Sequence, residues 1–257
     1  DSALGRQRRL NSVGESVLQI APSAAAAYSL RSLTGGDPRV VRVRRDTGGG
    51  AGDNDEEDFT VSEINSGALV AFVGSGNDGF VETWYDQSGN SNDAVQATAA
   101  EQPKIVNAGA YLGKVKFDGT DDSFDAVSIS SSSFPVSVIS LSSPAVTNST
   151  IGLYGINTQS GGFYHSTPKI SIFAGSRLDS SVTPVADNDF IRTDIFNGSS
   201  SSLSVNGTET TGTIGTSTTA LNKFEVGNST QSGNNIFNGS IKEIILYTSD
   251  QSANRTA

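Results

Sequence analysis

The chain has 257 residues and a formal net charge of −10; 35% of its residues are hydrophobic and 17% are charged. It contains no cysteine, which excludes disulfides and thiolate metal sites, and its single histidine excludes a multi-histidine zinc site. No apolar run approaches the roughly 20 residues that span a bilayer, so membrane insertion is not expected. The acidic balance disfavours nucleic-acid binding, because clustered lysine and arginine are needed to neutralise phosphate groups.

Positive charge is concentrated at the N-terminus. The first 45 residues hold eight arginines against three acidic residues, a balance of +5, whereas the remainder carries nine basic and 24 acidic residues, a balance of −15. Residues 1–23 contain too little apolar sequence to form a core, so we expect an extended N-terminal arm. The arm is predicted to dock on a neighbouring subunit through Arg6, Arg8, Arg9, Val13, Val17, Leu18 and Ile20; a flexible, solvated terminus is the alternative.

Two segments in the first third of the chain differ from the β-rich remainder. Residues 47–58 combine three consecutive glycines with five acidic residues and are predicted to form a mobile acidic loop, since they offer little apolar surface to bury. One short helix is expected over residues 68–72, with Asn65 or Ser66 as the N-cap and Gly74 as the stop.

Short segments of alternating polarity predict strands. Three Asn-Gly pairs, at residues 197–198, 206–207 and 238–239, predict tight turns, because both residue types accept a positive φ. Many short strands separated by turns are typical of a β-sandwich, so we predict an all-β, two-sheet antiparallel jelly roll over residues 24–257. The predicted strands cover residues 39–45, 80–85, 114–118, 134–141, 149–154, 162–165, 169–174, 190–196, 201–205, 223–226 and 241–247.

The most distinctive segment is residues 80–93, FVETWYDQSGNSND, an aromatic strand that runs into a turn rich in Asp, Ser, Gly and Asn. Together with AAAAYSLR at residues 24–31, QPKIVN at 102–107 and FDGTDD at 117–122, it resembles a concanavalin-like jelly-roll module of phage tail and other virion proteins. The first part of that module is similar to the catalytic domain of arabinofuranosidase B enzymes.

The C-terminal part of the chain extends this resemblance. Residues 195–207 are similar to a hairpin of laminin-G-like domains that ends in VNG, and residues 238–247 are similar to the closing strand of that superfamily. The resemblance implies a concanavalin-like sandwich and a place in a virion. It implies no catalytic residues, because the part of the enzyme family that carries the nucleophile and acid has no match here.

Sugar recognition requires an exposed aromatic platform with amide and carboxylate partners. Trp84 could supply the platform or lie in the core, and the sequence favours burial. We also expect the Asp86 side chain to accept hydrogen bonds from backbone amides of its own turn. The candidate glycan-binding residues are Trp84, Tyr85, Asp86, Asn90, Asn92, Tyr164 and His165.

Metal binding and catalysis have less specific signals. Asp118, Asp121 and Asp122 form a carboxylate cluster whose repulsion Ca²⁺ would relieve, although water on an exposed loop would do the same. A glycosidase needs two carboxylates about 5 to 9 Å apart across a cleft, and with 27 acidic residues their presence discriminates nothing.

The function expected from the sequence is that of a non-enzymatic phage virion protein, surface-exposed or tail-associated, which requires no cofactor. Its expected partners are other virion subunits, in a homo-oligomeric or larger assembly, and a cell-surface glycan. A glycoside hydrolase of the arabinofuranosidase type and a secreted bacterial adhesin module are the alternatives.

Overall fold

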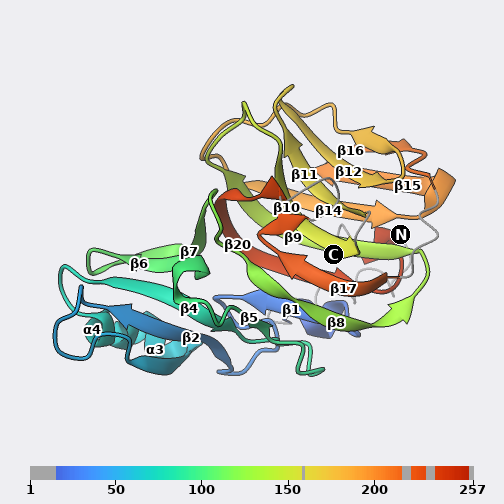
Figure 1. Ribbon diagram of the computed structural model, residues 1–257. Helices are drawn as coiled ribbons and strands as arrows, with labels where there is room; N and C mark the ends of the chain where they lie inside the picture. Colours follow the sequence, from blue (N-terminus) through green and yellow to red (C-terminus); the bar gives the residue numbers. More distant parts are fainter. Residues whose placement is uncertain (1–15, 158–159, 216–220, 230–234, 255–257) are drawn as a thin grey trace.

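The computed structural model describes residues 16–157, 160–215, 221–229 and 235–254. Within these residues, strands form a sheet of twelve, a sheet of six and a two-stranded ribbon, and every pairing is antiparallel. Part of the larger sheet faces the smaller one, and the rest extends beyond it to the lower left of Figure 1. The structure therefore confirms the predicted all-β antiparallel sandwich.

The strands of the larger sheet are β1 (Ala26–Ser29), β2 (Arg39–Asp46), β3 (Glu56–Thr60), β4 (Asp78–Trp84), β5 (Ala94–Val95), β6 (Lys104–Asn107), β7 (Ala110–Asp118), β9 (Val136–Pro144), β14 (Phe190–Phe196), β15 (Ser201–Val205), β16 (Thr208–Gly212) and β20 (Asn238–Tyr247). They follow the order β16-β15-β14-β9-β20-β7-β6-β4-β2-β3, with β1 beside β20 and β5 beside β4.

The smaller sheet contains β8 (Phe124–Ser132), β10 (Ile151–Asn157), β11 (Ser160–His165), β12 (Lys169–Ala174), β13 (Arg177–Asp179) and β17 (Leu221–Val226), in the order β13-β12-β11-β10-β17-β8. The ribbon consists of β18 (Asn228–Ser229) and β19 (Asn235–Ile236). The described residues also form three 3₁₀ turns: η1 (Ala99–Glu101), η2 (Gly198–Ser200) and η3 (Ser252–Asn254).

Aromatic side chains dominate the core between the sheets. Trp84 has no exposed surface, and its ring lies 5.9 Å from that of Tyr28 and 6.0 Å from that of Phe124. The contacts continue through Phe117 to Phe237. Burial of Trp84, which the sequence favoured, is therefore confirmed, and it leaves the indole no face for a ligand.

Three short α-helices accompany the strands: α2 (Val17–Ile20), α3 (Val61–Ser66) and α4 (Ala68–Val73), of which α3 and α4 lie against the sheet next to β2 and β3 (Figure 1). Gly74 ends α4 as predicted, with φ 83° and its N–H bonded to the Val70 carbonyl at 2.9 Å. The predicted N-caps are wrong, because Asn65 and Ser66 belong to α3, and Gly67 with φ 87° joins the two helices. No helix in the described ranges has the length and apolarity to cross a bilayer.

The Asn-Gly pairs have three different roles. Asn206 and Gly207, with φ 49° and 81°, form the predicted two-residue turn between β15 and β16. Residues 197–198 lead into η2 between β14 and β15. The turn predicted at residues 238–239 is wrong: both residues lie in β20, and a Cβ on Gly239 would approach the Ser143 carbonyl oxygen to 2.3 Å. Glycine is therefore required there for close strand packing.

The acidic segment also differs from its prediction. Its last residues begin β3, where Glu56 pairs in register with Arg44 and Asp58 with Arg42. Cross-strand charge pairing stabilises this edge strand despite its low apolar content. The mobile loop predicted over residues 47–58 is therefore wrong for its C-terminal part.

Residues 16–24 lie on the outer face of the sandwich. The α2 residues Val17 and Leu18 pack against an apolar cluster that includes Ile245 and Tyr247, and the Leu18 amide donates to the Leu33 carbonyl at 3.0 Å. The tyrosine hydroxyl donates to the Ala21 carbonyl at 2.8 Å. Val17 and Leu18, two of the predicted docking residues, thus contact apolar partners of their own chain, and Ile20 is half-buried in α2. Arg6, Arg8, Arg9 and Val13 lie outside the described residues, and docking on a neighbouring subunit stays a prediction.

Candidate functional site

A row of side chains crosses the outer face of the larger sheet. Arg44 on β2 is in register with Phe80 on β4, Phe80 with Lys104 on β6, and Lys104 with Lys116 on β7. Residues directly opposite each other in neighbouring strands project from the same face. The row therefore brings one aromatic ring and three cations together from segments spread over more than seventy residues.

A cavity of about 250 Å³ opens beside this row. Its walls come from four elements and their connections: β4, β6, β7 and η1. The lining residues are Phe80, Ala100, Lys104, Lys116, Asp118 and Asp122.

The two lysines of the cavity differ in their partners. The Lys104 ammonium donates to Asp78 at 2.6 Å and to Asn107 at 3.3 Å, and it lies 5.3 Å from the centre of the Phe80 ring. Lys116 is exposed, and its ammonium makes no hydrogen bond or ion pair with any residue in the described ranges. One cation of the cavity is thus neutralised, and the other has its donors available.

The predicted carboxylate cluster forms the acidic side of the cavity. Ligand oxygens of Asp118, Asp121 and Asp122 lie within 4.8 Å of one another. Asp122 accepts from the Asp118 amide at 2.8 Å, and Asp118 accepts from the Thr120 amide at 2.7 Å. Burial and the neighbouring Asp118 raise the pKa of Asp122 to about 7. The three carboxylates could contribute to a Ca²⁺ site, which needs six to eight oxygen ligands.

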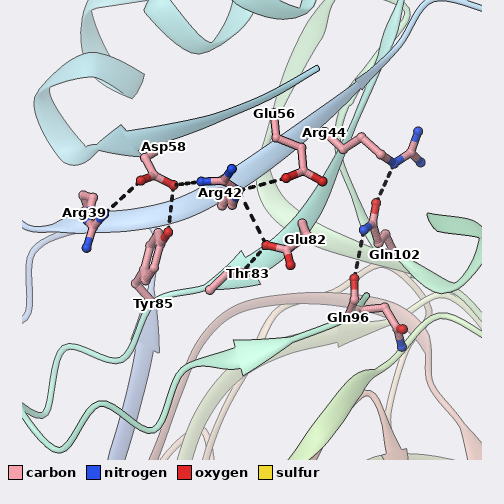
Figure 2. A network of polar contacts seen from close by, with 10 residues as sticks. All are labelled: Arg39, Arg42, Arg44, Glu56, Asp58, Glu82, Thr83, Tyr85, Gln96 and Gln102. Atoms are coloured by element: carbon pink, nitrogen blue, oxygen red, sulfur yellow. Dashed lines mark hydrogen bonds and ion pairs between the residues drawn. The ribbon is translucent and has the colours of Figure 1, made fainter. Parts of the chain in front are cut away.

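A dense ion-pair network lies next to the cavity (Figure 2). Arg42 is the centre of it and donates to Glu56 at 3.0 Å and to Asp58 at 3.2 Å, while Glu82 lies 3.9 Å away. Tyr85 donates to Asp58 at 2.7 Å. Although burial opposes the shift, hydrogen bonds from Tyr85 and the arginines hold the pKa of Asp58 below its ordinary value. Glu56 and Asp58 are therefore held as ion pairs.

Arg44 lies two residues beyond Arg42 on β2 and contacts residues around the cavity. Its guanidinium donates to Gln102 at 2.7 Å (Figure 2). It also donates to the Ala99 carbonyl at 3.1 Å and lies 4.9 Å from the centre of the Phe80 ring. The Gln102 amide in turn donates to the Gln96 carbonyl at 2.8 Å. These bonds fix η1 and the Phe80 ring, so the cavity walls are preorganised.

The polar side chains of the loop after Trp84 form hydrogen bonds with backbone groups of the same chain. Asp86 accepts from the amides of Ser88 at 2.8 Å and Asn92 at 3.0 Å, which confirms the predicted closure of its own turn, and also from the Ala27 amide at 2.8 Å. The Asn90 side chain donates to the Ala24 carbonyl at 2.8 Å, and that of Asn92 to the Ala25 carbonyl at 2.7 Å. The loop fastens β4 to the segment that begins β1.

The predicted glycan-binding residues are consequently not brought together. Tyr164 lies on β11 of the smaller sheet, is fully buried, and bonds through its hydroxyl to Ser142 at 3.1 Å. His165 follows it, half-buried, and burial and Arg177 lower the pKa of its imidazole. Trp84 and Tyr164 thus have no ring face for a sugar, because tertiary packing takes both rings into the core. The predicted sugar-binding platform of seven residues is therefore wrong.

Sequence reasoning did not find the cavity residues Phe80, Lys104 and Lys116. The available signal was alternation, since Lys114 and Lys116 flank a buried valine on β7 and share one face. Alternation places a lysine on a face but does not pair β7 with β6 and β4. The cavity depends on that pairing.

Comparisons with known proteins support the fold. No family model matches the chain, and no curated protein matches it. An arabinofuranosidase complexed with arabinofuranosyl-α-1,2-xylobiose is similar in structure, with a TM-score of 0.60 and 14% identity over 87% of this chain and 58% of that one. A GH54 α-L-arabinofuranosidase soaked with a cyclic sulfate inhibitor gives a TM-score of 0.56 at 14% identity, with the same coverage of both chains.

A Trypanosoma rangeli sialidase in complex with sialic acid matches 67% of this chain and 30% of its own, with a TM-score of 0.50 and 13% identity. This chain therefore spans less than two thirds of each of these proteins. At such identities the similarity concerns the β-sandwich itself.

Proposed function

We propose that this chain is a non-enzymatic structural module of a phage virion, surface-exposed or tail-associated, and that it assembles with other virion subunits. The observation that carries the proposal is that residues 80–93, which resemble a segment of virion modules, use their polar side chains to hold the sandwich together. Its Asp and Asn side chains connect β4 to the start of β1 by hydrogen bonds to the backbone. A motif used in this way supports a structural role for the module.

The ion pairs of Figure 2 also favour this proposal over a hydrolase. A glycosidase needs one carboxylic acid that can protonate the leaving group and a second carboxylate that acts as base or nucleophile. Glu56 and Asp58 are bonded to Arg42, and the Thr83 hydroxyl donates to Glu82. A nearby guanidinium stabilises the ionised form of a carboxyl group, which is opposite to what a general acid requires.

The hydrolase alternative rests on the fold, because the arabinofuranosidases and the sialidase act on sugars and share the β-sandwich. Fold alone does not imply an activity. The direct test is hydrolysis of 4-nitrophenyl α-L-arabinofuranoside and related aryl glycosides by the purified chain. No turnover is expected; turnover abolished by Glu56→Gln, Glu82→Gln or Asp122→Asn would overturn the non-enzymatic proposal.

Attachment to the particle is proposed to use the residues that precede α2. Arg6, Arg8 and Arg9 would meet acidic groups of a neighbouring subunit. Since Val17 and Leu18 cover apolar residues of this chain, deletion of residues 1–23 would also uncover that cluster. Deletion of residues 1–15 is therefore the informative variant.

The test uses phage that carry the full-length or the shortened chain, followed by mass spectrometry and immunogold labelling of purified particles. We expect the shortened chain to fold with the same thermal midpoint and to be absent from particles. A control in which Arg31, on the body, is changed to Ala should incorporate normally. Normal incorporation of the shortened chain would place attachment on the sandwich, and absence of the full-length chain from purified particles would refute the virion role and favour the adhesin alternative.

A further inference from the structure

We infer that the cavity lined by Phe80, Lys104, Lys116, Asp118 and Asp122 binds a single neutral sugar residue. None of the seven residues that the sequence predicted to bind a glycan lines this cavity. The inference concerns a site on the outer face of β4, β6 and β7, and it holds whether or not the chain belongs to a particle.

Charge balance favours a neutral ligand. The lining contains two lysines and two aspartates; Lys104 is paired with Asp78, which leaves the Lys116 ammonium together with the Asp118 and Asp122 carboxylates, so unpaired charges of both signs line the cavity. A divalent cation beside Asp118 and Asp122 would be repelled by the Lys116 ammonium, and an anion beside Lys116 would be repelled by the carboxylates. A polyhydroxylated ring avoids both penalties.

The hydrogen-bonding groups also suit a sugar. Each sugar hydroxyl is both a donor and an acceptor, so it is best satisfied between a carboxylate and an ammonium. Asp118 and Asp122 each use one carboxylate oxygen in the bonds described above, and Lys116 uses none of its donors within the described chain. Phe80 provides an apolar wall for the C–H groups of the ring.

The size and rigidity of the cavity limit the ligand. Its 250 Å³ is below the roughly 300 to 1,000 Å³ of sites that hold drug-sized ligands, so one sugar ring is the appropriate occupant, with any further residues of a glycan left in solvent. The bonds from Arg44 to Gln102 and to the Ala99 carbonyl hold the adjoining wall in place. Few contacts and a small buried area predict a dissociation constant on the order of 1 mM.

The test is a ¹H–¹⁵N NMR titration of the ¹⁵N-labelled chain with arabinose, galactose, glucose and N-acetylglucosamine in turn. At least one sugar should shift the amides of Phe80, Ala100 and Asp118. Lys116→Ala should weaken that binding about tenfold, because a charged donor is lost. Lys114→Ala is the matched control: it lies two residues away on β7, does not line the cavity, and should leave the affinity unchanged.

Calcium chloride and sodium glucuronate serve as ionic probes in separate titrations. The inference is overturned if none of the four sugars shifts the cavity amides, if the shifts lie on another face, or if only an ionic probe binds. Equal sugar affinity in Lys116→Ala and the wild-type chain would overturn it as well. Because Lys116 is exposed, its replacement should not disturb folding, and the thermal midpoint of each variant checks this.

Discussion

The two sheets are connected by a buried ion pair that offers a sharp test of the packing. Arg192 and Asp194 on β14 are completely buried, and their side chains approach to 2.7 Å. The guanidinium also donates to the carbonyls of Phe163 at 3.3 Å and Ser171 at 3.1 Å, both in the smaller sheet. The Tyr154 hydroxyl donates to the same carboxylate at 2.6 Å. The pair is thus the centre of a polar cluster between the sheets.

The perturbation is Asp194→Leu, which replaces the two carboxylate oxygens with methyl groups on the same branched skeleton. Arg192 then stays charged and buried, with two carbonyls and the Tyr164 ring as its remaining partners. Breaking one side of a buried pair costs about 3 to 5 kcal/mol. Burial and the adjacent Asp194 raise the pKa of Tyr154 well above its ordinary value, so its hydroxyl remains a neutral donor that loses its acceptor. The orphaned hydroxyl adds about 1 kcal/mol or more.

Replacing both partners should cost less than replacing one. Arg192→Met alone leaves a buried carboxylate and should also cost about 3 to 5 kcal/mol, whereas the double variant with Asp194→Leu carries no buried charge. Its residual cost is the unpaired Tyr154 hydroxyl, about 1 to 3 kcal/mol, and adding Tyr154→Phe should recover part of it. The double variant should therefore be more stable than Asp194→Leu.

Guanidinium chloride unfolding at pH 7 measures these differences, followed by the fluorescence of Trp84, the single tryptophan, which is fully buried and will report loss of the core. Folded proteins are stable by about 5 to 15 kcal/mol, so Asp194→Leu will lose a large fraction and can fail to fold while the double variant still does. An Asp194→Leu cost under about 1 kcal/mol, or a double variant less stable than both single variants, would refute the reasoning.

Three further changes test other parts of the structure. Asp86→Ala removes the acceptor of three backbone amides and should lower the free energy of unfolding by about 3 kcal/mol in urea titrations; a loss below 1 kcal/mol would show that water replaces the carboxylate. Because the pKa of Asp122 is raised to about 7 in the folded chain, the wild-type chain should lose stability as the pH rises from about 4 through 7. The free energy of unfolding of Asp122→Asn should therefore rise by about 1 to 2 kcal/mol relative to that of the wild type between pH 4 and 8, and parallel stability curves would contradict this. Gly162→Ala places a Cβ 2.4 Å from the Tyr154 ring and should lower the thermal midpoint by an amount equivalent to about 1 to 3 kcal/mol, whereas Gly36→Ala, with open space around it, should not change it.

The strand pattern was predictable from the sequence because it depends on local alternation. The strands expected at residues 169–174, 190–196 and 201–205 have the bounds observed for β12, β14 and β15. The strand β3 was missed, since its acidic residues form a strand only when the arginines of β2 are opposite them. Helix α3 was also missed, although Thr60 and Glu63 carry a capping-box signature, and both reciprocal bonds are present.

The candidate site was less predictable because it depends on which strands become neighbours. Asp118, Asp121 and Asp122 were grouped correctly, as residues of one turn stay close in any fold. Trp84 and Tyr164 were grouped on chemistry alone, and the two sheets take each ring into the core. Aromatic residues in alternating strands carry no local mark of which face will be buried.

Most of the positive charge in the first 45 residues is paired with carboxylates of the same chain. Five of the eight N-terminal arginines lie on the body and approach carboxylates there: Arg31 with Glu243, Arg39 with Asp58, Arg42 with Glu56, Arg44 with Asp46 and Arg45 with Asp55. Such pairs contribute little stability singly, about 0 to 1 kcal/mol each where exposed, but they neutralise the positive charge of the segment that follows α2. The other three N-terminal arginines are Arg6, Arg8 and Arg9, which lie outside the described residues. A partner that recognises this chain by charge should therefore lose affinity when these three residues are changed to Ala, and should be indifferent to charge reversal of Arg31.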